Sequence, residues 1–161
     1  MPEQIKSRSR ARIKAKHFFV RTLLLLLPTL LNIGRLLSPK IQNEIDYLSP
    51  GYTFALTVAN TTLCCACQRT EGGSWKHIPS SRLAQQPITY TIEFRDPAYA
   101  FACFSGSLSL QGALAARLFT TRGPNDTGVA LTYMFTTLLH AFFFWRSAYA
   151  SSTRRSSHAR L

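Results

Sequence analysis

The chain has 161 residues, a length that suits one domain with a modest core and terminal extensions. Its net charge of +12 is unevenly distributed along the chain. Residues 1–40 carry nine lysines and arginines and one acidic residue, whereas residues 41–150 carry seven basic and six acidic residues. A fold that tracks nucleic-acid phosphates needs basic residues on its folded surface, so this distribution argues against a nucleic-acid partner. Basic chain ends instead favour contact with an acidic surface such as a membrane leaflet.

The first forty residues divide into two parts. Residues 1–17 are basic and nearly devoid of large apolar side chains, so we expect a disordered leader. Residues 18–40 predict a leucine-rich helix. Its longest uncharged run, residues 22–34, is shorter than the roughly 20 residues that cross a bilayer. Pro28 should kink or divide this helix.

Three interpretations of the leucine-rich helix stay open. It has the charge order of a cleaved signal peptide, although no small-residue cleavage site follows. It also suits a membrane-surface helix whose basic flanks hold acidic headgroups. The third interpretation is a helix packed on the body of the protein or on another chain.

Four strands are predicted in the next part of the chain, because apolar side chains alternate there with small or polar ones. Their ranges are 52–58, 62–70, 74–78 and 88–94. The second and third are joined by the sequence Glu-Gly-Gly-Ser, whose glycines suit a tight hairpin turn.

The cysteines cluster in the second of these strands. Cys64 and Cys67 form a CxxC pair, but no second pair follows and His77 is the only imidazole nearby. A structural zinc site normally needs four spaced ligands, so we predict no metal. Strand alternation places Cys65 and Cys67 on one face as small buried apolar groups. Such clustering is a poor disulfide framework and fits a reducing cytosol.

Helices follow the fourth strand. Residues 95–104 predict a short helix with Asp96 as its N-cap, and residues 107–118 predict a second one. A short strand, residues 118–122, then leads to a corner and to a last helix over residues 127–145. The apolar side chains of that helix cover more than half of its circumference, so it must be buried or lie in an interface. Residues 151–161 predict a basic disordered tail.

The corner itself contains an arginine, a glycine and a proline, which raises the question of a phosphate-binding loop. A loop of the Walker type needs a lysine and a run of free backbone N–H groups before a helix. The chain has no lysine here, and Pro124 lacks an N–H group. We therefore interpret Gly123 and Pro124 as a strand-to-helix corner.

The order of elements from residue 88 onward resembles the sterol carrier protein-2-like (SCP-2-like) domain. The residues that carry the resemblance are Phe94, Asp96, Phe101, Gly106, Leu110, Ala113 and Gly123. Gly73 and Trp75 resemble the first half of that domain more loosely, and the resemblance covers about residues 45 to 145. It implies an α+β fold in which a five-stranded, mostly antiparallel sheet has helices packed over one face around an apolar cavity.

The resemblance also implies a function. Members of the family bind a fatty acyl chain, a sterol or a phospholipid without catalysis, and one bacterial branch assists ubiquinone synthesis. The expected domain is residues 41–150, and the expected ligand is a lipid of these kinds or an isoprenoid quinone precursor. The residues predicted to line the lipid cavity are Phe94, Phe101, Phe104, Leu114, Leu118, Met134, Leu138 and Phe142.

Catalysis is not expected, since the chain offers no assembled acid, base and nucleophile. Glu93 and Asp96 are close in sequence, but Asp96 is already explained as a cap. No serine lies in a G-x-S-x-G turn, and His140 stands among aromatic residues. We expect a cytoplasmic, peripheral membrane protein that binds lipid without a cofactor and touches acidic membranes through residues 1–40. The alternatives are a structural subunit that docks a protein partner through its apolar helices, and nonspecific RNA binding by the basic ends.

Overall fold

The computed structural model describes residues 2–143, and residues 13–142 with their side chains. The strands are β1 (Thr53–Val58), β2 (Cys64–Arg69), β3 (Trp75–Ile78), β4 (Tyr90–Phe94) and β5 (Phe119–Arg122). The helices are α1 (Pro2–Leu37), α2 (Pro39–Tyr47), α3 (Ser80–Leu83), α4 (Pro97–Phe104), α5 (Leu110–Ala115) and α6 (Asn125–Phe143). The last helix, α6, begins at Asn125, two residues before the predicted start. The predicted tail at residues 151–161 lies outside the described residues.

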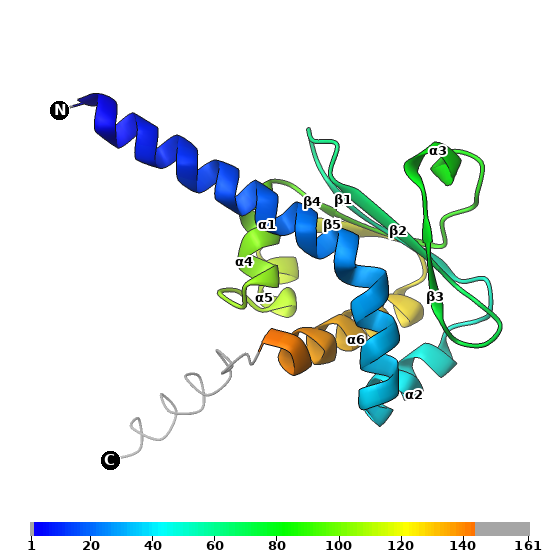
Figure 1. Cartoon of the computed structure of the whole chain (residues 1–161). Helices are drawn as coiled ribbons and strands as arrows, with labels where there is room; N and C mark the ends of the chain where they lie inside the picture. Colours follow the sequence, from blue (N-terminus) through cyan, green and yellow to red (C-terminus); the bar gives the residue numbers. More distant parts are fainter. Residues whose placement is uncertain (1, 144–161) are drawn as a thin grey trace, which may run out of the picture.

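The five strands form one mixed sheet in the order β3-β2-β1-β4-β5 (Figure 1). β1 and β4 pair in parallel, and the other three pairs are antiparallel. The parallel pair requires a crossover, because a tight turn joins only antiparallel neighbours. Residues 79–89, which include α3, make this crossover. The predicted α+β class with a mostly antiparallel, five-stranded sheet is confirmed.

The two faces of the sheet are buried to different depths. On the inner face, alternate residues of β1 and β4 such as Phe54, Leu56 and Phe94 join one large core with α1, α2, α4, α5 and α6. On the outer face, Ala55, Ala66 and Ile78 form a small cluster covered by the crossover segment. Small side chains suit this outer face, because only a short segment covers it.

Local sequence explains the corners and caps. The Asp96 carboxylate accepts a hydrogen bond of 2.6 Å from the backbone N–H of Ala98, so the predicted N-cap of α4 is confirmed. Gly123 has a φ of +139°, and a Cβ there would lie 2.6 Å from the carbonyl oxygen of Thr89. A residue with a side chain would collide with β4 at this point. The interpretation of Gly123 as a strand-to-helix corner is therefore confirmed.

The N-terminal part of the chain departs from the predicted organisation. Residues 2–17, predicted as a disordered leader, form the first half of α1. The stretch is rich in lysine and arginine and contains two alanines, residue types with high helix propensity, so a helix anchored further along extends through it. α1 also runs through Pro28 without a break, and its axis bends part-way along its length (Figure 1). A bend is the expected effect of a proline that cannot donate its backbone hydrogen bond.

The predicted domain boundary at residue 41 also changes. Five side chains of α1 belong to the same core as the sheet, namely Val20, Leu23, Leu24, Leu27 and Leu31. The folded unit therefore begins within α1. In this structure the leucine-rich helix packs on the body of the protein, which was the third of the three interpretations.

Candidate functional site

The candidate site is the apolar layer between the inner face of the sheet and the helices. Its aromatic rings meet edge-on: the ring centroids of Phe54 lie 5.0 Å from Trp75 and 5.4 Å from Phe135. The ring centroid of Phe94 lies 5.5 Å from that of Phe104, again edge-on, and 5.3 Å from that of Phe119, whose ring is tilted against it. The layer is thus continuous from β3 across β1 and β4 to β5, with α6 over one part and α4 over another.

Most of the residues predicted to line a lipid cavity lie in this layer. Phe94, Phe104, Met134 and Leu138 are buried in it. Phe101, Leu118 and Phe142 are half-buried and pack against its edge. Leu114 is 46% exposed, because Leu110 and Ala113 take the inward positions of the short helix α5. Seven of the eight predicted residues are therefore brought together, and Leu114 lies apart from them.

α1 contributes a wall of this layer that the sequence did not predict. Its buried leucines lie over the sheet, and Phe19 meets Phe101 of α4 with ring centroids 5.2 Å apart. Near the other end of α1, a Cβ on Gly34 would lie 2.7 Å from Leu138 of α6. The absence of a side chain at Gly34 therefore lets α1 approach α6 closely.

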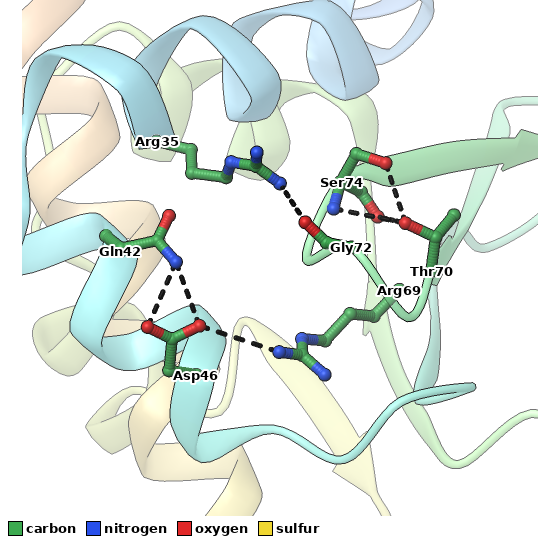
Figure 2. Close-up of polar contacts among 7 residues, drawn as sticks. All are labelled: Arg35, Gln42, Asp46, Arg69, Thr70, Gly72 and Ser74. Atoms are coloured by element: carbon green, nitrogen blue, oxygen red, sulfur yellow. Dashed lines mark hydrogen bonds and ion pairs between the residues drawn. The ribbon is translucent and has the colours of Figure 1, made fainter.

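Polar contacts hold the end of α1 against the β2–β3 hairpin. The side-chain amide of Asn32 donates to the carbonyl of Trp75 at 2.9 Å and accepts from its N–H at 2.8 Å. These bonds satisfy the open edge of β3 as a neighbouring strand would. Arg35 donates to the carbonyl of Gly72 at 2.7 Å, as Figure 2 shows.

An ion pair joins the same hairpin to α2. Arg69 is buried, and its guanidinium lies 3.6 Å from the carboxylate of Asp46. Gln42 donates to both oxygens of that carboxylate, at 2.8 and 3.0 Å (Figure 2). Thr70 and Ser74 close the hairpin by hydrogen bonds to each other. The hairpin is therefore fixed to both α1 and α2, which positions Trp75 at the end of the apolar layer.

No protein-family model and no curated protein sequence matches the chain. Among solved structures, "UbiJ-SCP2 Ubiquinone synthesis protein" superimposes with a TM-score of 0.54 over 75% of this chain and 93% of that one, at 13% identity. The chain has the SCP-2-like fold. A sterol carrier protein 2-like 2 structure from Aedes aegypti aligns with 58% of this chain and 90% of that one, at 11% identity and a TM-score of 0.37.

The cysteines of this SCP-2-like fold lie where the strand pattern predicted them. Cys65 and Cys67 point to the inner face, with their sulfur atoms 3.8 Å apart. Hydrogen bonding with Cys65, together with burial, raises the pKa of the Cys67 thiol far above its usual value. Burial raises the pKa of Cys103 to about 11 and also raises that of Cys64. The raised pKa values of Cys64, Cys67 and Cys103 do not favour a nucleophile, because a thiol attacks as its thiolate.

The remaining candidates for chemistry are dispersed. Among the described residues, no group of three or more histidine, cysteine, aspartate or glutamate side chains is close enough to hold a metal ion. Glu93 lies on the outer face of β4, and Asp96 caps α4. At its centre, the SCP-2-like fold assembles an apolar interface between the sheet and the helices, and such an interface suits an apolar ligand.

Proposed function

We propose that this protein is a non-catalytic lipid-binding module that works at the cytoplasmic surface of a membrane as a carrier or presenting factor. The observation that carries the proposal is the SCP-2-like fold, with its continuous apolar layer between sheet and helices. The ligands that fit such a layer are a fatty acyl chain, a sterol, a phospholipid or an isoprenoid quinone precursor. The name of the similar structure, a ubiquinone synthesis protein, supports the last of these.

The physical basis is the burial of a hydrocarbon chain. Each methylene moved from water into an apolar layer contributes about 0.8 kcal/mol, so a long chain is held with little polar recognition. Met134 lies fully buried at the centre of α6, and its unbranched thioether adapts to irregular contents. A ligand would enter by separating helices from the sheet rather than by opening the sheet.

The proposed membrane contact is the outward face of α1. Its exposed apolar side chains are Phe18, Leu25, Leu26, Ile33, Leu36 and Leu37, opposite the face that packs on the sheet. By length and composition, Ile13–Leu37 suffices to cross a membrane, but 39% of its most apolar stretch is buried within the protein. A helix held to the body by one face and apolar on the other suits attachment to a leaflet surface, with the basic residues before it near acidic headgroups.

The ligand is tested by lipid extraction. Natively purified protein should release a lipid in stoichiometric amount, identified by mass spectrometry. The Met134→Trp variant should lower uptake of that lipid, since the larger side chain takes up ligand space. Overpacking of a rigid core would instead cost about 1–3 kcal/mol of unfolding free energy. Lost stability, with no lipid bound by the parent protein, would overturn the proposal.

The membrane contact is tested by flotation with anionic vesicles. Leu26→Ser should weaken the attachment, because Leu26 is 50% exposed on the outward face of α1. Leu114→Ser is the matched control, since Leu114 is similarly exposed but lies on α5. Equal flotation of the two variants would contradict the membrane role. It would favour the alternative, in which the outward face of α1 docks a protein partner.

A further inference from the structure

A cleft of about 330 Å³ opens between α1, the β1–β2 turn and the end of β3. It lies beside the apolar layer rather than within it. α1 supplies His17, Arg21 and the neighbouring leucines to one wall. Thr62, His77 and Ser80 supply much of the opposite side.

The rim of this cleft is cationic and rich in hydrogen-bond donors. Arg21 and His77 are exposed, His17 is half-buried, and no carboxylate lines the cleft. Within the described part of the chain, the side chains of Arg21 and His77 make no hydrogen bond or ion pair with other residues. A guanidinium offers a planar fork of donors that matches a phosphate, and each imidazole and hydroxyl adds a donor. The rim therefore has the chemistry of an anion site whose donors are unused.

The floor of the cleft is apolar. Leu24, Leu63 and Ile78 line it and are buried. A small inorganic anion gains nothing from such a floor, whereas an amphiphile gains from burying its first methylene groups there. The combination favours a ligand with a phosphate at one end and hydrocarbon at the other.

The position of the cleft agrees with that ligand. Lys14, His17 and Arg21 are three and four residues apart, so they follow one side of α1. Leu25 lines the cleft and also belongs to the outward apolar face of α1. When that face lies on a leaflet, the cleft opens at the depth of the headgroups.

We propose that the cleft between α1 and β3 binds the phosphate group of an anionic lipid, with Arg21, His17 and His77 as the donors. This inference rests on the proposed lipid-binding function and adds the headgroup class to it. The phosphate anchors the headgroup at the rim, and the apolar floor holds the adjoining part of the chain.

The experiment is calorimetric titration of the whole protein with three short soluble probes. Dihexanoyl phosphatidic acid carries the phosphate and the chains, dihexanoylglycerol carries the chains alone, and glycerol phosphate carries the phosphate alone. The parent protein should bind the first more tightly than the second. Arg21→Gln should weaken phosphatidic acid binding about tenfold, the scale of a lost charge-assisted hydrogen bond, and leave dihexanoylglycerol unchanged. His77→Gln should act in the same direction.

The matched control is Arg122→Gln. Arg122 is an exposed arginine on β5, at the opposite edge of the sheet from β3, so the variant loses the same charge elsewhere. Equal affinities for phosphatidic acid and dihexanoylglycerol, or equal losses in the two arginine variants, would overturn the proposal. If glycerol phosphate binds as tightly as phosphatidic acid, the cleft is a phosphate site, and the ligand that supplies the phosphate is a soluble phosphate ester instead of a lipid.

A second measurement separates this site from the proposed function. The parent protein and Arg21→Gln are tested for uptake of uncharged lipid from vesicles. If the protein takes up lipid but shows no preference for phosphate, the proposed headgroup site is wrong and the lipid-binding function stands. If binding depends on phosphate but no lipid is taken up, the headgroup site is supported and the carrier function is contradicted.

Discussion

The two halves of α1 show how differently one helix can be stabilised along its length. Residues 18–37 put five side chains into the core and are tied to β3 through Asn32. The beginning of α1 extends past the body of the protein (Figure 1), and its first described side chains, Ile13 to Ala15, are exposed. Local propensity continues the first half as helix, while tertiary packing holds the second half in place. Changes to the two halves of α1 should therefore have effects of very different size on stability.

Deletion of residues 1–37 should abolish cooperative unfolding. Each buried side chain of α1 contributes about 1.5–3 kcal/mol, so the five together rival the ~5–15 kcal/mol of net stability that domains usually have. Deletion of residues 1–12 should change the unfolding free energy by less than about 1 kcal/mol, because this end of α1 extends past the body of the protein (Figure 1). Urea denaturation followed by circular dichroism measures both. A cooperative transition retained after the longer deletion would show that the core closes without α1.

Within the second half of α1, the inward and outward faces should differ sharply. Leu31→Ala removes a side chain that is 0% exposed and should cost about 2–5 kcal/mol of unfolding free energy. Leu36→Ala removes one that is 78% exposed and should cost less than about 0.5 kcal/mol. Equal losses in urea denaturation would mean that α1 does not pack on the sheet by this face.

The contact between α1 and the edge of β3 should have an intermediate effect. Asn32→Ala leaves the N–H and carbonyl of Trp75 without their partner, which should cost about 1–3 kcal/mol. Asn43→Ala is the control, because Asn43 is exposed on α2. Hydrogen exchange at the Trp75 amide should also become faster in the first variant only. Unchanged exchange there would contradict the role of Asn32.

The smallest effect should come from the junction of the two halves. The ammonium of Lys16 lies 5.5 Å from the ring centroid of Phe101, a cation–π contact worth about 0.5–1 kcal/mol when exposed. Lys16→Gln should lower the unfolding free energy by this amount. Lys14→Gln removes the same charge from an exposed position two residues earlier and should have no measurable effect. An equal change in both variants would reflect overall charge rather than this contact.

Several features were predictable because their causes are local. Strands β1 to β4 follow from alternation with period two and from turn glycines, and the α4 cap follows from Asp96 placed before Pro97. The inward position of Cys65 and Cys67 follows from the same alternation. The order of these elements resembles that of the SCP-2-like domain, and this resemblance indicated the fold that the structure has.

By itself, the sequence determined the strands, the α4 cap and the cysteine faces, because each depends on neighbours within a few residues. Only the tertiary structure decided where α1 packs. Its residues are apolar on both faces, so periodicity does not say which face meets the sheet. The cleft around Arg21 and His77 could not be predicted from the sequence either, because α1, the β1–β2 turn and β3 meet there only after folding. A site assembled from three distant segments leaves no spacing in the chain by which to recognise it.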